Sequence, residues 1–110
     1  MIKEAILIGR KNEYRIREGE FNVGRAKDSP SNIQINEPLN LFVSRRHCKI
    51  YNDEEKLEIM DIGSRNGTYV NGNRITPRKR VILINGDKLK LAGCELEVKI
   101  VEESNVLNKS

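Results

Sequence analysis

Cysteine and histidine are scarce in this chain, and their scarcity excludes several kinds of site. The 110 residues include two cysteines, Cys48 and Cys94, which are too few and too far apart for a zinc knuckle or a redox C-x-x-C pair. We expect two buried thiols, although the spacing also leaves a single disulfide open. The only histidine, His47, adjoins Cys48, but neighbouring strand residues point to opposite faces, so the two form no catalytic dyad. We find no enzyme-like set of nucleophile, base and metal ligands, and we expect no metal and no cofactor.

Long apolar runs are also absent. Neither end of the sequence carries a stretch suited to a transmembrane span or a secretory signal, so we expect no membrane partner and a cytoplasmic location. The length suits one domain. We predict that this domain occupies residues 1–102 and that the polar residues 103–110 form a flexible tail.

Apolar and polar residues alternate along most of the chain, and this period of two indicates β-strands. The alternation is clearest where charged residues separate Leu96, Val98 and Ile100. Asn71-Gly72 predicts a tight hairpin turn, because that turn needs positive φ at both positions. No window has a sustained period of 3.6 residues, so we expect no helix. Short strands with turns between them predict an all-β fold, a β-sandwich of two antiparallel sheets with functional loops at one end.

Two polar segments, at 43–47 and 61–72, interrupt the strand pattern, and both are rich in Ser, Arg, Asn and Gly. Such segments form loops. Guanidinium groups, hydroxyl groups and backbone N–H groups beside glycine offer many hydrogen-bond donors to a small dianion. The residues alone therefore favour a phosphate-reading site on loops at the end of a β-scaffold. The formal charge of +4 favours acidic partners without choosing among them.

Five short motifs, in their order and spacing, resemble the forkhead-associated (FHA) domain family. The matching segment runs roughly from Phe21 to Ile100, and each motif alone is weak. The motifs are Gly24-Arg25, Ser44-x-x-His47, Asp61-x-Gly63-Ser64-x-Asn66-Gly67-Thr68, Asn71-Gly72 and Gly86-Asp87. The resemblance implies a β-sandwich that binds phosphothreonine peptides, a non-enzymatic module for kinase-dependent protein–protein interaction.

The resemblance also implies roles for individual residues. Arg25 and Ser44 would hold the phosphate oxygens, and Arg45 would add donors from its backbone N–H. Asn66 would hydrogen-bond the main chain of the peptide, and Arg65 would border the same groove. The remaining motif residues would shape and brace the loops: Gly24, His47, Gly67, Thr68, Asn71 and Gly72.

Each binding residue also has a structural alternative. Arg25, Arg45 and Arg65 could be ordinary solvent-facing charges at strand ends and loops. Ser44 could cap a turn, and Asn66, which precedes a glycine, could serve only as a turn residue. The sequence favours the binding roles, because the motifs occur together.

The main alternative function is binding of nucleic acid or another polyanion through an arginine-rich surface. Its members would be Arg45, Arg46, Arg65, Arg74, Arg78, Lys79 and Arg80. Aromatic residues make up 5% of the chain and none is interleaved with this cluster, so the stacking platforms of nucleic-acid binders are missing. Nucleic acid is therefore the less favoured partner.

The resemblance extends to the partner peptide. In relatives, the residue two before the serine helps to read the third position after the phosphothreonine. That residue is Phe42 here, so we expect an apolar preference. The only threonines are Thr68, which looks structural, and Thr76, which lies beside Pro77. We therefore expect another protein, modified by a Ser/Thr kinase, to supply the phosphothreonine, and the sequence leaves the oligomeric state open.

Overall fold

The computed structural model describes residues 1–26, 32–38 and 40–103. These residues form eleven strands and one short 3-10 helix. The elements are β1 (Ile2–Ile8), β2 (Glu13–Arg15), β3 (Gly19–Gly24), β4 (Asn32–Gln34), η1 (Asn40–Phe42), β5 (Cys48–Asn52), β6 (Leu57–Asp61), β7 (Thr68–Val70), β8 (Asn73–Arg74), β9 (Val81–Leu83), β10 (Lys88–Leu91) and β11 (Cys94–Glu102). All but the first residue of the predicted tail lie outside the described residues.

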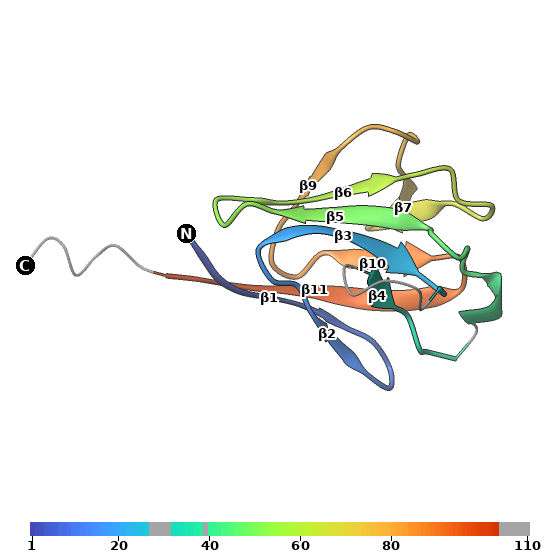
Figure 1. Cartoon of the computed structure of the whole chain (residues 1–110), viewed down its shortest axis with the longest axis horizontal. Helices are drawn as coiled ribbons and strands as arrows, with labels where there is room; N and C mark the ends of the chain where they lie inside the picture. Colours follow the sequence, from blue (N-terminus) through green and yellow to red (C-terminus); the bar gives the residue numbers. More distant parts are fainter. Residues whose placement is uncertain (27–31, 39, 104–110) are drawn as a thin grey trace, which may run out of the picture.

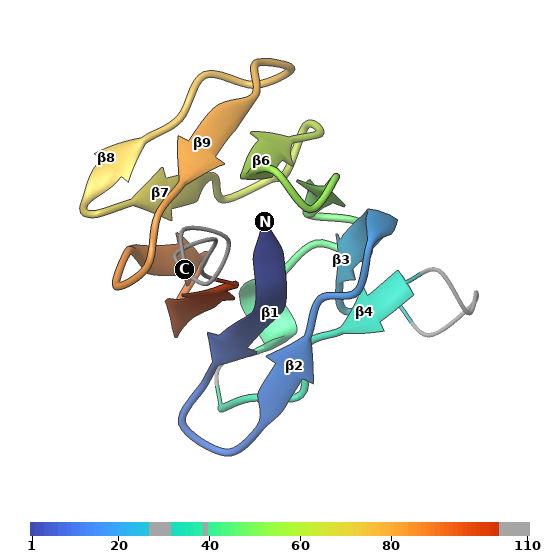
Figure 2. The ribbon, with the colours of Figure 1, turned by 90° about the vertical axis from the view of Figure 1, so that its left-hand side faces the viewer.

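The strands form two facing sheets (Figure 1). One sheet has the order β2-β1-β11-β10-β7-β8, and the other has the order β4-β3-β5-β6-β9. Figure 2 shows β3, β4 and β6 of the second sheet as a layer separate from β1 and β2 of the first. The predicted β-sandwich is confirmed.

Two local features differ from the sequence-based expectation. Strand β4 pairs with β3 in parallel, with Val23 opposite Ile33, whereas the prediction had only antiparallel pairs. Alternation marks a strand but does not specify the direction in which it pairs. The expectation of no helix is also wrong at η1, where the N–H of Val43 donates to the carbonyl oxygen of Asn40 at 3.0 Å. Three residues are too few to show a helical period.

The core between the sheets is mainly aliphatic. Leu7 and Val98 from the first sheet, and Ile50 and Ile59 from the second, are buried there. Strands β6 and β11, which carry Ile59 and Val98, alternate buried and more exposed positions, as the strands of a two-sheet sandwich do. The two cysteines are buried and unpaired, which confirms the prediction of two thiols.

The N-terminus and the C-terminal end of β11 lie at one end of the sandwich, and the polar loops lie at the other (Figure 1). β1 and β11 pair along their length, and the N–H of Glu103 donates to the carbonyl oxygen of Met1 at 2.8 Å. The segments 43–47 and 61–67 lie at the far end. Within the described part of the chain, no helix is long and apolar enough to cross a bilayer.

Candidate functional site

Two segments far apart in the sequence meet at the loop end of the sandwich. The N–H of Arg25, which directly follows β3, donates to the carbonyl oxygen of Ser44 at 3.0 Å. The N–H of Ala26 donates in the same way to the carbonyl oxygen of Arg45 at 3.0 Å. The side chain of Arg25 adds a bond from its Nε to the carbonyl oxygen of Val43 at 3.1 Å. The structure therefore places Arg25 and Ser44 side by side.

Gly24 permits this close approach. A Cβ at that position would lie 2.3 Å from the carbonyl oxygen of Arg45 and 2.7 Å from that of Ser44, and a carbon atom cannot sit that close to backbone oxygens. The requirement at Gly24 is therefore one of space, which agrees with its predicted role in shaping the loop.

The loop at 61–67 joins the same cluster. The N–H of Arg65 donates to the Oγ of Ser44 at 3.0 Å, and the side-chain amide of Asn66 donates to the carbonyl oxygen of Phe42 at 2.8 Å. Because Ser44 Oγ accepts the bond from Arg65, its own O–H is left to donate elsewhere. The two loops thus present side-chain donors toward a common space.

That space is a surface cavity of about 650 Å³, which we call the loop-end cavity. It contains every residue predicted to bind the ligand. Its lining comprises Arg25, Leu41, Phe42, Val43, Ser44, Arg45, Arg46, Arg65 and Asn66.

His47 is fully buried and braces the two loops. Its Nδ1 accepts a bond from the N–H of Ser44 at 3.1 Å, and its Nε2 lies 2.7 Å from the carbonyl oxygen of Gly67. These partners require the neutral ring with the proton on Nε2. Burial lowers the pKa of His47 below its usual value and favours that neutral form, although the bond to Gly67 and the charge of Asp61 act in the opposite direction.

Asp61 is a buried carboxylate whose partners belong to the loop that follows it and to the first residue of β7. Its Oδ1 accepts bonds from the N–H groups of Gly63 at 2.8 Å and Ser64 at 3.0 Å. Its Oδ2 accepts bonds from the hydroxyls of Ser64 and Thr68. Burial alone would raise the pKa of Asp61, but these bonds outweigh it and hold the pKa below the usual value. Thr68 is therefore occupied inside the molecule.

Glu37 supports the site, and the sequence reasoning missed it. Its buried carboxylate accepts bonds from the N–H of Lys11 at 2.8 Å, the N–H of Asn12 at 3.0 Å and the hydroxyl of Tyr14 at 2.6 Å. Burial tends to raise the pKa of Glu37, but these bonds keep it below the usual value. Burial, together with the bond to Glu37, raises the pKa of Tyr14 to about 12, so Tyr14 keeps its proton. The β1–β2 turn is thus fixed to the segment that leads into η1.

Asn71 and Gly72 lie outside the loop-end cavity. Their φ values of 51° and 84° confirm the predicted hairpin turn, which joins β7 to β8. The side chain of Asn71 donates to Asp87 at 2.9 Å and accepts from the N–H of Lys88 at 2.9 Å. Asn71 therefore ties this turn to the one that precedes β10.

A second cavity, of about 1090 Å³, lies beside the first, over β7, β10 and β11. Phe42 and Asn66 line both cavities. Phe42 is 61% exposed and Leu41 is 78% exposed, so two bulky apolar side chains stand beside the arginines that line the loop-end cavity. In residues 1–26, 32–38 and 40–103, no three His, Cys, Asp or Glu side chains gather as metal ligands.

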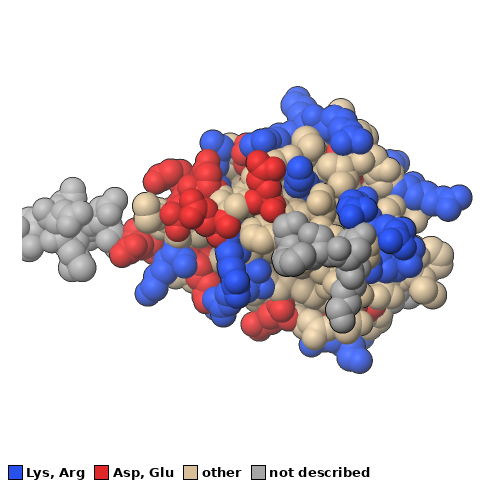
Figure 3. Space-filling model, viewed as in Figure 1, with Lys and Arg blue, Asp and Glu red and all other residues tan. Residues whose placement is uncertain are grey.

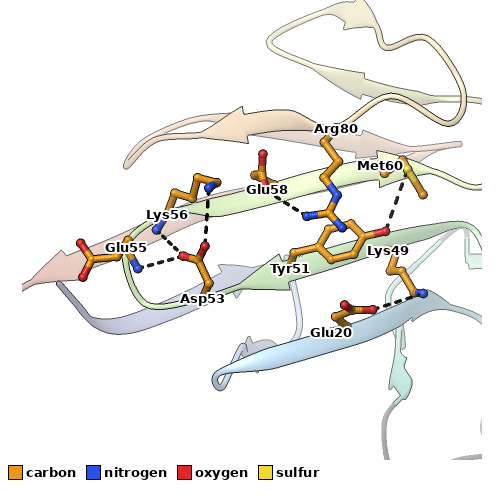
Figure 4. A network of polar contacts seen from close by, with 9 residues as sticks. All are labelled: Glu20, Lys49, Tyr51, Asp53, Glu55, Lys56, Glu58, Met60 and Arg80. Carbon is orange, nitrogen blue, oxygen red and sulfur yellow. Dashed lines mark hydrogen bonds and ion pairs between the residues drawn. The ribbon is translucent and has the colours of Figure 1, made fainter.

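The predicted arginine-rich surface divides into two parts. In the view of Figure 3, most Asp and Glu side chains lie toward the end that carries the N-terminus, with some Lys and Arg among them, whereas the loop end shows mainly Lys and Arg. Arg80, however, reaches across the outer face of the second sheet, where its guanidinium stacks 3.6 Å from the ring centre of Tyr51 and pairs with Glu58 at 3.3 Å (Figure 4). The charge of Arg80 is therefore engaged by Tyr51 and Glu58 within the fold.

Comparison with known proteins identifies the family. The family model of the FHA domain matches residues 21–92 of this chain. The chain belongs to the FHA domain family. Among curated proteins, this FHA domain is 34% identical over 92 residues to the FHA domain-containing protein FhaA of Mycobacterium tuberculosis, which covers 84% of this chain and 16% of that protein. It is 41% identical over 49 residues to the oxoglutarate dehydrogenase inhibitor of Corynebacterium jeikeium, which covers 44% of this chain and 32% of that protein. The FHA domain thus spans a third or less of these two relatives.

Solved structures agree with this assignment. An FHA domain from a study of phosphothreonine-dependent FHA interactions superposes with a TM-score of 0.77 at 27% identity, covering 92% of this chain and 100% of that one. The MEK1 FHA domain in complex with a HOP1 phosphothreonine peptide superposes with a TM-score of 0.72 at 25% identity, covering 89% and 97%. The family is a phosphopeptide-recognition family, and this FHA domain shares its fold.

Proposed function

We propose that this FHA domain binds phosphothreonine in partner proteins and so mediates interactions that depend on an upstream Ser/Thr kinase. The observation that supports it most is the convergence of Arg25 and Ser44 on one cavity, since their backbones are joined by a 3.0 Å hydrogen bond. A phosphothreonine carries a charge of about −1.5 to −2 and three acceptor oxygens. A guanidinium fork and a hydroxyl donor are matched to such a group.

Within the described residues, Arg25, Ser44 and Asn66 keep donors for the ligand. Arg25 uses its Nε within the fold, which fixes the direction of the guanidinium while its terminal nitrogens remain to pair with phosphate oxygens. Ser44 has a hydroxyl proton to donate. Asn66 anchors one amide N–H on Phe42, and the rest of its amide would hydrogen-bond the peptide main chain.

The exposed side chains of Leu41 and Phe42 support an apolar preference next to the phosphothreonine. Burying a methylene-sized group against such side chains stabilises a complex by about 0.8 kcal/mol. A peptide with Leu or Ile at the third position after the phosphothreonine should therefore bind more tightly than one with Asp there.

The phosphothreonine would come from another protein, and the domain would act without catalysis. Thr68 is buried and bonded to Asp61, so it is not a candidate ligand in the folded domain. Thr76 is exposed, but it follows β8 and lies outside the loop-end cavity. A modified Thr76 found in the groove of a neighbouring copy would contradict this proposal.

The test is binding of labelled phosphothreonine peptides by the wild-type protein and by Arg25→Ala. Removing one partner of a desolvated charge pair costs about 2–5 kcal/mol. A micromolar complex amounts to about 8 kcal/mol, so the variant should show no measurable binding. Arg17→Ala removes another exposed arginine, outside the loop-end cavity, and should bind as the wild type does. Equal binding by all three proteins, or binding that survives phosphatase treatment of the peptide, would refute the proposal.

Nucleic acid remains the competing ligand to test. A nucleic-acid complex would weaken steeply with salt and would be indifferent to Arg25→Ala. Titration of a single-stranded oligonucleotide at two salt concentrations therefore separates the two functions.

A further inference from the structure

Three arginines flank the backbone of the loop that follows Asp61, and we call them the arginine arc: Arg65, Arg74 and Arg78. We infer that the arginine arc forms a second anion-binding surface, which selects phosphopeptides carrying an additional acidic or phosphorylated side chain. This inference rests on the proposed function, since it concerns the same ligand. It adds a contact beyond the phosphothreonine itself.

Gly67 makes room for one outer member of the arc, and Gly63 lies at ordinary contact distance from the other. The guanidinium of Arg74 lies over Gly67, with its Nε 2.8 Å from where a Cβ of that residue would be. A terminal nitrogen of Arg78 lies 3.7 Å from the corresponding position of Gly63. Gly63 and Gly67 bound the short loop that carries Arg65 and Asn66. The arc therefore begins at the loop-end cavity, where Arg65 lies, and continues along both sides of this loop.

The backbone holds the arc in place. Arg74 ends β8 and pairs with Tyr69 of β7, and the N–H of Arg78 donates to the carbonyl oxygen of Asp61 at 2.9 Å. Side chains fixed on paired backbone lose less freedom when they bind a ligand than side chains on loose loops. The arc is therefore preorganised for a ligand beside the loop-end cavity.

The charges of the arc are not neutralised within the described residues. Arg65, Arg74 and Arg78 are exposed, and none of them pairs with a carboxylate of residues 1–26, 32–38 or 40–103. Asp61, the acid nearest to Arg65 in sequence, is buried and directs its oxygens to Gly63, Ser64 and Thr68. An acidic side chain of a ligand could therefore pair with three guanidinium groups that no carboxylate of the described residues occupies.

The backbone conformation of Arg78 also supports the inference. Its φ is 67°, in the left-handed region that glycine adopts at lower cost than any residue with a side chain. An arginine at this position therefore stores backbone strain, and such strain is typical of residues kept for their contacts with a ligand.

The experiment compares four labelled peptides that share one phosphothreonine. One has neutral flanks, one has three glutamates before the phosphothreonine, one has three glutamates that begin at the fourth position after it, and one has a second phosphothreonine three residues before it. The glutamate and phosphate arms separate the two sources of negative charge. The proteins are the wild type, the double variant Arg74→Gln/Arg78→Gly and the charge-matched control Lys3→Gln/Lys99→Gln, whose lysines lie on β1 and β11.

The wild type should bind at least one of the three acidic peptides about fivefold more tightly than the neutral one at low salt, as expected for two or three exposed ion pairs. That gain should disappear in the arginine double variant and persist in the lysine control. Arg78→Gly should also raise the midpoint of thermal unfolding, because glycine adopts this positive φ without strain. A loss of affinity would then not reflect a damaged fold.

Three results would overturn the inference. These are no gain from acidic flanks in the wild type, a gain retained by the arginine double variant, and a gain lost equally in the lysine control. In each case binding of the neutral phosphopeptide, and its dependence on Arg25, would still stand as the separate test of the proposed function. An oligonucleotide that binds more tightly than every phosphopeptide, through Arg74 and Arg78, would instead assign the arc to nucleic acid.

Discussion

Arginine serves opposite purposes on two surfaces of this FHA domain. On the outer face of the second sheet, Arg80 stacks on Tyr51 and pairs with Glu58, so its charge stabilises the sandwich (Figure 4). At the loop end, Arg25 donates to a backbone carbonyl and keeps its terminal nitrogens for another partner. The same side chain is a structural contact in one place and, under the proposed function, a binding group in the other.

The difference lies in where the neighbouring acid points. Glu58 and Asp61 are on the same strand, β6. Glu58 faces outward and meets Arg80, whereas Asp61 is buried and bonds to its own loop. Since Asp61 is turned inward, it orders the loop without neutralising the arginines outside. Under the proposed function, the anion-binding loop is thus ordered by a buried acid.

The largest expected effect is on stability, from the two acids of β6. Asp61→Ala should lower the free energy of unfolding by about 3 kcal/mol or more, because it leaves buried donors without an acceptor. Glu58→Ala should lower it by about 1 kcal/mol or less, as for an exposed ion pair. Urea denaturation of both variants measures this contrast, and similar losses would contradict it.

A second contrast compares two glycines. Gly24→Ala forces the backbone of β3 and the 44–45 segment apart, so we expect a loss of about 1–3 kcal/mol in stability and a clear loss of phosphopeptide affinity. Gly72→Ala meets no atom within 4 Å, but its φ of 84° strains any side chain. It should lower the melting temperature and leave affinity unchanged. Retained affinity in Gly24→Ala would contradict the positioning role of Gly24.

A third test uses the pH dependence of stability. His47 is the only histidine, and its pKa in the fold lies below the ordinary value of 6.5. The unfolded chain therefore binds more protons in this range, so stability is full above pH 6.5 and falls as the pH decreases below it, by at most about 1.4 kcal/mol per pH unit. Denaturation of the free protein over a range of about two pH units centred on that value measures this loss.

The control for this pH test is His47→Gln, which should be less stable than the wild type but should show a flatter profile over the same range. An unchanged profile would assign the effect to other groups. The free protein is used because phosphothreonine itself titrates with a second pKa of about 6, which would confuse a binding measurement.

The smallest effect is expected at Arg80. Arg80→Ala should reduce stability by about 1 kcal/mol, the sum of a cation–π contact and an exposed ion pair. Phosphopeptide affinity should stay at the wild-type level, as calorimetric titration would show. Arg25→Ala should behave in the reverse way, with normal stability and lost binding. If Arg80→Ala also lost binding, the division between the two surfaces would be wrong.

Features set by a single residue or a short motif could be predicted from the sequence. The positive φ values required at Asn71-Gly72 made that turn predictable, and alternation marked most strands. The motif order also indicated that Arg25, Ser44 and Asn66 act together, and the structure brings all three to one cavity.

Features that depend on long-range pairing were not predictable. Glu37 has no distinctive neighbours in sequence, and its partners Lys11, Asn12 and Tyr14 lie more than twenty residues earlier. Arg80 appeared equivalent to the other arginines of its cluster, because no sequence pattern shows that it crosses β6 to reach Tyr51. Burial of a charged group is decided by the whole fold, and local composition does not record it.

The pairing of β1 with β11 has a practical consequence for surface-based assays. Met1 and Glu103 meet at the end of the sandwich remote from the loops (Figure 1). A tether attached at Met1 would hold the protein with Arg25 and Ser44 facing the solution. Immobilisation there would leave the peptide route open, so chip-based and solution affinities should agree.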